Sequence, residues 1–201
     1  MPLVYGDMAS GNCYKIALLF SRLGIEHEWQ GTLVVHGETR TEEFRALNPA
    51  GQIPVVVLED GTVLTQSNAI LYYFARNTDL VPADPLLMTR MLEWQFFEQY
   101  SHEPTIAVRR FIQKFLQMPA DRRAEYAQLE EGGYRALGVL ERCLAENDFL
   151  VGSAYSLADI SLYAYTHVAD EGGFDLSSFP AINGWLDRVQ GEPGYIGMNS
   201  R

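Results

Sequence analysis

The 201-residue sequence predicts an α/β domain followed by an all-helical domain. Strand-like and helix-like segments alternate through residues 1–77, in the order β-α-β-α-β-β-α. Residues 78–86 contain two Asp and two Pro residues and are typical of a linker. Beyond them the strand signals disappear and apolar residues recur at helical spacing. We therefore expect residues 87–201 to form a second domain, built from helices alone.

The first strand is expected at residues 3–6 and the first helix at residues 13–23. Apolar side chains in that helix fall at i, i+3, i+4 and i+7, which places them on one face. Gly24 follows at the position where a glycine commonly ends a helix. Residues 28–35 predict a second strand, and residues 41–47 predict a short helix that ends before a proline.

The segment of residues 48–71 is the most informative part of the chain. Pro54 has no backbone N–H and therefore suits the first position of a strand, and the bond before it can be cis at low cost. Residues 59–62 read Glu-Asp-Gly-Thr, and Asp-Gly is the strongest short hairpin signal. Ser67 then stands where it can cap a helix over residues 68–76, whose first N–H groups can hold a carboxylate.

The second domain is expected to contain helices within residues 86–117, 120–147 and 157–169. Ser156 and Asp159 form a capping pair at the start of the last of these helices. The serine side chain can accept a hydrogen bond from the backbone N–H of the third helical residue, Asp159. The aspartate side chain can accept one from the backbone N–H of Ser156. We expect this pair to act in folding and not in catalysis.

Both domains are acidic, and this narrows the classes of partner. The net charge is −11, with nine acidic and five basic residues before position 81 and 17 and 10 after it. No basic face therefore favours nucleic acid or an anionic membrane surface, and no apolar run reaches the roughly 18 residues of a membrane span. The two distant cysteines argue for a reducing compartment, and the first residues lack a signal-peptide pattern. We expect a cytoplasmic protein, with no metal site.

Residues 48–71 resemble the glutathione half of the glutathione S-transferase superfamily. The resemblance implies that glutathione binds as a co-substrate and pairs its cysteinyl backbone with Ile53, just before a cis Pro54. It also implies that Gln66 and Ser67 hold the γ-glutamyl end of glutathione, and that the first domain has a thioredoxin-like fold. Many members carry Glu where this chain has Gln66, so the charge that could pair with the ligand's α-amino group is missing.

Two later segments extend the resemblance over nearly the whole chain. The capping pair matches one at a buried helix of the family's second domain. The sequence after residue 178 looks like the family's C-terminal helix, through Pro180, Trp185, Arg188 and Pro193. The chain thus resembles bacterial, cytosolic members of this superfamily, of a serine type or of a type that uses Thr and Asn.

The resemblance places the sulfur of glutathione at the start of the first helix. Serine-type members have a serine six residues before the first apolar helix residue, and Ser10 stands six residues before Ile16. Another bacterial group uses a Thr there and an Asn two residues later, which matches Ser10 and Asn12. A hydroxyl or amide donor stabilises the thiolate, helped by N–H groups at the helix start. Ser10 and Asn12 are therefore the expected catalytic residues, with helix-cap and turn roles as the alternatives.

Cys13 is also close to this position. Cysteine-type members of the superfamily place their nucleophile where Ser10 stands, three residues before Cys13. A buried free cysteine usually behaves as a small hydrophobe, and we expect that role here rather than a redox one.

Further contacts complete the predicted glutathione site. Arg40 lies near the position from which a Lys or His of the family often reaches the glycyl carboxylate, and a solvated loop charge is the alternative. His36 is close enough to take its place. Gln52, in Gly-Gln-Ile-Pro, matches a common glutathione contact of the family.

The second substrate is expected to meet the helical domain. Tyr100, His102 and Arg109 are the candidate pocket residues. Pro104 can bend or restart the helix, which would turn His102 and Arg109 toward the ligand. Core packing is the alternative for these side chains.

Three functions remain open from the sequence. The first is a transferase in which glutathione thiolate attacks a small hydrophobic or electrophilic substrate, as in detoxification. The second is glutathione-dependent reduction of disulfides or peroxides, and the third is a non-catalytic glutathione-binding module. The family is usually a homodimer, and the Tyr72-Tyr73 and Trp94–Phe97 regions are the candidate contact faces.

Overall fold

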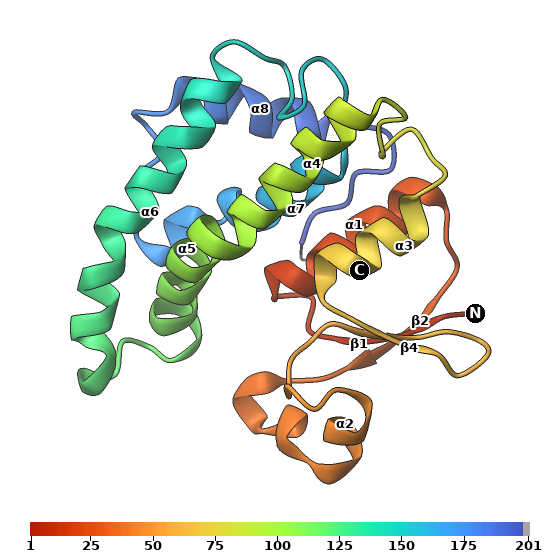
Figure 1. Ribbon diagram of the computed structural model, residues 1–201. Coiled ribbons are helices and arrows are strands. Elements are labelled where there is room, and N and C mark those ends of the chain that lie inside the picture. Colours follow the sequence, from red (N-terminus) through yellow and green to blue (C-terminus); the bar gives the residue numbers. More distant parts are fainter. Residues whose placement is uncertain (199–201) are drawn as a thin grey trace. The chain divides into compact units, whose positions relative to one another are not determined.

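The computed structural model describes residues 1–198 and divides into two compact units (Figure 1). The first unit comprises Met1–Thr78 together with residues 193–198, and the second comprises Asp79–Glu192. The α/β and all-helical fold classes predicted from the sequence are both confirmed.

The sheet of the first unit has four strands in the order β2-β1-β3-β4. Strand β1 pairs in parallel with β2 and antiparallel with β3, and β3 pairs antiparallel with β4. This mixed sheet is the one expected of a thioredoxin-like domain. The strand bounds are Leu3–Gly6 for β1, Glu28–Gly31 for β2, Val55–Val57 for β3 and Val63–Thr65 for β4.

Helices α1 (Gly11–Leu23) and α3 (Ser67–Ala75) lie together on one face of this sheet, and α2 (Glu42–Leu47) lies on the other side (Figure 1). The predicted apolar stripe of α1 is buried, with Ile16 and Phe20 fully covered. Helix α1 ends at Gly24, whose left-handed backbone (φ 63°) donates its N–H to the carbonyls of the last turn, as predicted.

Strand β2 ends at Gly31, although the sequence predicts strand as far as residue 35. Its neighbour β1 stops at Gly6, and the last bond between them runs from the Thr32 N–H to the Gly6 carbonyl at 3.1 Å. With no partner strand beyond that point, the chain turns through two short 3-10 helices, Val34–His36 and Glu38–Arg40.

The second unit consists of helices. Its longer elements are α4 (Pro85–Phe97), α5 (Glu103–Arg110), α6 (Arg123–Leu144), α7 (Leu157–Thr166) and α8 (Pro180–Gln190). The helix predicted at residues 86–117 is interrupted by two π-helical turns, Glu98–His102 and Phe111–Phe115. Pro104 lies in the first turn of α5, where its missing N–H removes no required hydrogen bond, and the π turn before it absorbs the change in register.

All ten residues of α7 are buried, and the predicted capping box is present. Asp159 accepts hydrogen bonds from the Ser156 and Leu150 backbone N–H groups, each at 2.9 Å, and from Trp185 Nε1 at 3.0 Å. Burial nevertheless raises the pKa of this carboxyl to about 6, against the effect of those bonds.

Residues 193–198 pack on the first unit, whereas the sequence-based boundaries place them in the helical domain. The Tyr14 hydroxyl donates to the Ile196 carbonyl at 2.7 Å, and Arg22 Nη1 donates to the Pro193 carbonyl at 3.3 Å. These bonds join residues 182 and 171 positions apart, so no local sequence pattern indicates them.

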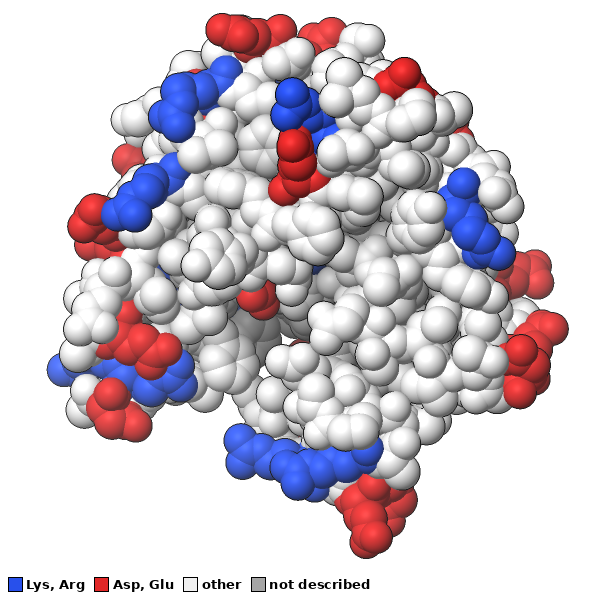
Figure 2. Space-filling view, viewed as in Figure 1, with Lys and Arg blue, Asp and Glu red and all other residues white. Residues whose placement is uncertain are grey.

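Charged side chains of both signs lie in small mixed groups on the face shown in Figure 2, separated by uncharged surface. Within the described part of the chain, no helix is long and apolar enough to cross a membrane.

Candidate active site

The start of α1 presents Ser10 in an extended conformation (φ −80°, ψ 126°) at the N-cap position. Its hydroxyl makes no capping bond to the helix. The helix-cap alternative for the Ser10 side chain therefore does not describe this geometry.

Cys13 is fully buried beneath this turn. Burial raises the pKa of its thiol to about 12, although hydrogen bonds with the Ser10 side chain and the Asp7 backbone oppose the shift. A Cβ added at Gly6 would lie 2.9 Å from the Cys13 sulfur, so the thiol fills a tight space against β1. Cys13 thus has the surroundings of a small hydrophobe and not of a reactive thiolate.

Asn12 joins the start of α1 to the start of α3. Its side-chain Oδ1 accepts a hydrogen bond from Lys15 Nζ at 2.8 Å and another from Ser67 Oγ at 3.0 Å. Lys15 Nζ also lies 3.4 Å from Ser67 Oγ, to which it donates. The predicted sulfur-binding and γ-glutamyl-binding elements are thereby brought into direct contact.

Lys15 is the member of this cluster that the sequence reasoning missed. Its side chain is fully buried, which is rare for a lysine. One signal was present, because Asn12 and Lys15 stand three apart and so share a face of the helix. The contact with Ser67, 52 positions away, had no signal in the sequence.

The Ile53–Pro54 peptide bond is cis, which confirms the sequence prediction. Strand β3 begins at Val55, so Ile53 lies just outside its ladder. Among residues 1–198, the Ile53 backbone N–H and carbonyl make no hydrogen bond to another part of the chain. An extended peptide could pair with them in the manner of an added strand.

The loop before Ile53 is held by a second residue that the sequence reasoning did not single out. Asn48 is buried, and its Nδ2 donates to the Gln52 carbonyl at 2.7 Å while its Oδ1 accepts from the Ala50 N–H at 3.1 Å. The Gln52 side chain is exposed at the surface of this loop.

Helix α3 begins one residue earlier than predicted. Gln66, and not Ser67, is the N-cap residue, and it adopts a positive φ of 68° that is uncommon for a residue other than glycine. This conformation leaves the Gln66 side chain exposed and places Ser67, which is 5% exposed, in the first turn. Such strained positions cluster at ligand sites.

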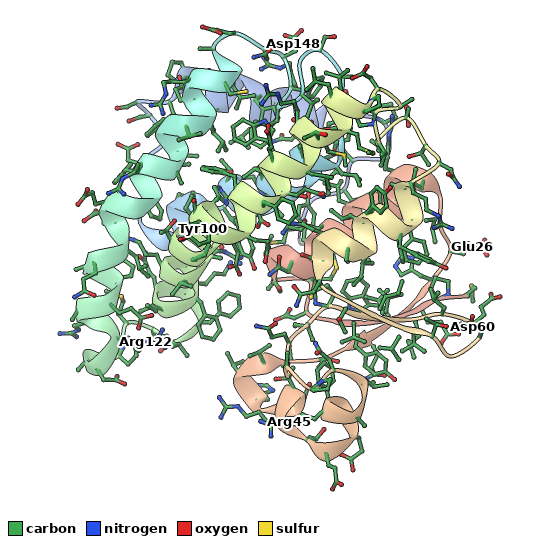
Figure 3. All side chains as sticks on the ribbon, viewed as in Figure 1. Glu26, Arg45, Asp60, Tyr100, Arg122 and Asp148 are labelled. Atoms are coloured by element: carbon green, nitrogen blue, oxygen red, sulfur yellow. The ribbon has the colours of Figure 1, made fainter. Side chains whose placement is uncertain are left out.

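Arg40 and His36 are both exposed, on the two short 3-10 helices that follow β2. Arg40 directly precedes Thr41, whose hydroxyl accepts the Phe44 N–H at 3.2 Å and caps α2. Figure 3 shows Arg45 on the same helix. No hydrogen bond between Arg40 and the Asn12 cluster is present among the described residues.

The three residues predicted for the second-substrate pocket do not gather in one place within the second unit. Tyr100 projects from the first π turn and is 89% exposed (Figure 3). His102 is fully buried and bonds through Nε2 to the Thr166 hydroxyl at 2.9 Å. Because that hydroxyl donates to the Leu162 carbonyl, His102 is the donor in this bond.

Arg109 is 3% exposed and is held by the second unit itself. Its Nε donates to the Gly172 carbonyl at 3.0 Å, and its guanidinium stacks over the Tyr126 ring at 3.9 Å and near the Phe174 ring at 4.8 Å. These contacts correspond to the core-packing alternative. Within residues 1–198, no three His, Cys, Asp or Glu side chains gather as a metal-binding group.

Comparison with known proteins gives the family. The sequence model of the glutathione S-transferase N-terminal domain matches residues 9–77, and that of the glutathione S-transferase C-terminal domain matches residues 91–193. The chain belongs to the glutathione S-transferase family. A crystal structure of a glutathione S-transferase from Pseudomonas fluorescens is 55% identical, with a TM-score of 0.97 and 99% of each chain covered.

Two further relatives of this glutathione S-transferase family member carry names other than glutathione S-transferase. A maleylacetoacetate isomerase from Methylobacterium extorquens, solved with bound malonate and glutathione, is 25% identical with a TM-score of 0.81, over 96% of this chain and 93% of that one. Elongation factor 1-gamma 2 from Oryza sativa is 30% identical over 79% of this chain, which corresponds to 38% of its own length.

Proposed function

We propose that the chain is a glutathione transferase that binds glutathione along the first unit and directs its thiolate at a small electrophile. The observation that carries this proposal is the bond between Asn12 and Ser67. It places the start of α1, where the sulfur is expected, against the start of α3, where the γ-glutamyl carboxylate is expected. The unbonded backbone at Ile53 supports the same placement of the tripeptide.

Glutathione supplies its own nucleophile, so the protein's tasks are to hold the thiol, to favour the thiolate and to position the electrophile. A thiol of pKa near 8.5 is about 3% ionised at pH 7, and lowering its pKa by about two units raises that fraction about 25-fold. Each thiolate is then about 8-fold less reactive, because nucleophilicity falls with pKa at a slope near 0.4–0.5, so the net gain in rate is only about three-fold. Most of the acceleration therefore has to come from holding the electrophile against the sulfur.

The remaining contacts are assigned by position. Gln66 and Ser67 hold the γ-glutamyl end, Ile53 beside Pro54 pairs with the cysteinyl backbone, and Gln52 and Arg40 face the glycyl end. Ser10 and Asn12 donate to the sulfur. Tyr100 remains the exposed candidate for contact with the second substrate.

Calorimetry with glutathione and a conjugation assay with an aromatic halide test this function. We expect wild-type protein to bind glutathione and to form the conjugate. Ser10→Ala and Asn12→Ala should each retain glutathione binding and lower the rate, by about 10- to 100-fold if each removes one strong donor to the thiolate. A protein that does not bind glutathione, or that binds it without Ile53 and Ser67, contradicts the proposal.

Glutathione-dependent disulfide reduction is the second candidate. It requires Ser10 and Asn12 to act together on the sulfur, as in the bacterial group whose Thr-and-Asn pattern they match. The hydrogen bonds that fix the Asn12 side chain favour this candidate. An assay coupled to glutathione reductase and NADPH separates the two activities. Glutathione binding without either activity would indicate a non-catalytic module. The similarity to elongation factor 1-gamma 2, whose name denotes no transferase, is the reason to include this third function in the test. A homodimer in the cytoplasm is the proposed setting for each of these functions.

A further inference from the structure

The Asn12 carboxamide can take only one orientation in this structure. Its Oδ1 faces two donors, the Lys15 ammonium at 2.8 Å and the Ser67 hydroxyl at 3.0 Å. Rotating the amide by half a turn would place its NH2 group against an ammonium, which has no lone pair to offer. The NH2 group of Asn12 is therefore held on the side of the amide opposite to Lys15 and Ser67.

Lys15 differs from Ser67 in how it holds this amide. A serine hydroxyl has one proton, and a carboxylate bound at the start of α3 would compete for it with Asn12 Oδ1. The Lys15 ammonium has three protons, and it bonds Asn12 Oδ1 and Ser67 Oγ at the same time. Lys15 can thus keep Asn12 in place while Ser67 turns to a ligand.

The charge of Lys15 also points to a role beyond packing. Its side chain is fully buried. Burying an ammonium is costly unless its partners are well placed, and two of the groups that it bonds, Asn12 Oδ1 and Ser67 Oγ, belong to the candidate site. A positive charge behind the amide oxygen polarises the carboxamide and makes its NH2 group a stronger donor to an anion.

We propose that Lys15 is a positioning residue of the sulfur site: it fixes and polarises the Asn12 carboxamide so that its NH2 group donates to the thiolate of bound glutathione. This inference rests on the proposed function, since it requires glutathione at the start of α1. It assigns the sulfur donor chiefly to Asn12, whose side chain is held by two hydrogen bonds, and it gives Ser10 a smaller share.

The test measures the pKa of the bound glutathione thiol, from the ultraviolet absorbance of the thiolate as a function of pH. Lys15→Met should raise that pKa by about one unit, which lowers the thiolate fraction about tenfold at a pH below it. Lys15→Arg, which keeps the charge, should bring the pKa back toward the wild-type value. Lys114→Met is the matched control, because the chain has only these two lysines and Lys114 pairs with Glu171 in the second unit; it should leave the thiol pKa unchanged.

A double-mutant cycle tests whether Lys15 acts through Asn12. In an Asn12→Ala background, Lys15→Met should cause no further shift in the thiol pKa. An equal shift in both backgrounds would mean that Lys15 acts on the sulfur directly, and would overturn the proposal. So would a wild-type thiol pKa in Lys15→Met protein that still binds glutathione.

A second variant covers the case in which Lys15→Met does not fold. Asn12→Asp keeps an acceptor for the buried ammonium, and thermal unfolding should show a folded protein. It replaces the NH2 donor by a negative charge, so the pKa of the bound thiol should rise further than in Asn12→Ala. Failure of Asn12→Asp to raise the thiol pKa overturns the proposal, and failure of wild-type protein to bind glutathione overturns both this inference and the proposed function.

Discussion

Gln66 stands where many members of the glutathione S-transferase family carry glutamate, and its exposed side chain projects from the start of α3. The amide can accept a hydrogen bond from the α-amino group of glutathione but offers it no charge. Around it the cluster of Asn12, Ser67 and Lys15 contributes one positive charge, which suits the ligand's carboxylate but not its amine. If Gln66 faces the γ-glutamyl end as proposed, a charge at this side chain should change the affinity for glutathione.

Gln66→Glu should tighten glutathione binding at pH 7. An exposed ion pair contributes about 0.2–1 kcal/mol, so we expect the dissociation constant measured by calorimetry to fall up to about five-fold. The gain should shrink as ionic strength rises. Gln52→Glu is the matched control, because a carboxylate near the glycyl end should not improve binding. Equal gains from both variants would contradict the placement of the amine.

Asp159 should make stability depend on pH. Burial raises the pKa of its carboxyl from 3.8 to about 6 in the folded protein, so folding favours the protonated form. The resulting contribution to the free energy of unfolding, about 3 kcal/mol, is complete below pH 3.8 and is lost as the pH rises through 6.

Denaturant unfolding of wild-type protein and of Asp159→Asn across pH 4 to 7 checks this prediction. The stability difference between them should shrink with rising pH, since the asparagine does not titrate. Asp159→Asn should be less stable at every pH, because its amide NH2 group meets the N–H donors of Leu150, Ser156 and Trp185. A difference that is constant with pH would contradict the raised pKa.

At the scale of elements, helix α6 illustrates how tertiary contact overrides local propensity. It carries glycines at positions 132, 133 and 138, and glycine is unfavourable inside a helix by about 1 kcal/mol relative to alanine. A Cβ added at Gly133 would lie 2.2 Å from the Phe174 ring, whereas one at Gly138 would have as its nearest neighbour Arg142 Nη1 at 3.7 Å. Gly133 is required by packing and Gly138 is not.

The pair Gly133→Ala and Gly138→Ala tests this difference within one helix. Gly138→Ala should raise the free energy of unfolding by up to about 1 kcal/mol through helix propensity. Gly133→Ala should lower it by about 1–3 kcal/mol, because the methyl group forces the Phe174 ring out of its place. Denaturant unfolding measures both, and stabilisation by Gly133→Ala would show that the ring moves at little cost.

Elements with a local signal were predicted correctly from the sequence. The apolar face of α1 with Gly24 at its end, the cis bond before Pro54 and the capping box of α7 each depend on residues close together in the chain. The early end of β2 was missed, because it depends on where β1 stops. The role of Arg109 depends on rings at Tyr126 and Phe174, which helical spacing does not indicate.

The candidate site shows the same division. Asn12 and Ser67 were predicted from their local motifs, and the structure brings their side chains into contact. Lys15 was missed because its importance arises only where two helix starts, 52 positions apart in sequence, come together. A sequence pattern of polar and apolar residues does not indicate which polar side chains are buried in the folded protein, so it could not predict that Lys15 is buried.

At the scale of the whole molecule, exposed apolar side chains favour the proposed homodimer. Tyr72 and Tyr73 on α3 are 40% and 37% exposed, and Phe96 on α4 is 71% exposed. These residues lie in the two regions that the sequence indicated as contact faces. Isolated apolar residues on a surface are ordinary, so the argument rests on their occurrence in both regions.

Sedimentation velocity over a range of protein concentrations should show a dimer for the wild type. Phe96→Glu and Tyr72→Glu should shift the protein toward monomer, because each introduces a charge into an apolar contact that must be desolvated. Val35→Glu is the matched control, since Val35 is 47% exposed but lies outside both regions. A wild-type monomer, or dissociation by the control alone, would contradict the assignment.

Residues 193–198 give the first unit a boundary that is not contiguous in the chain. A fragment ending at Thr78 would lose the Ile196 carbonyl that receives the hydroxyl of Tyr14, a side chain that is fully covered in the intact protein. A minimal glutathione-binding fragment should therefore include residues 193–198, joined to the first unit, and should not simply end at the linker.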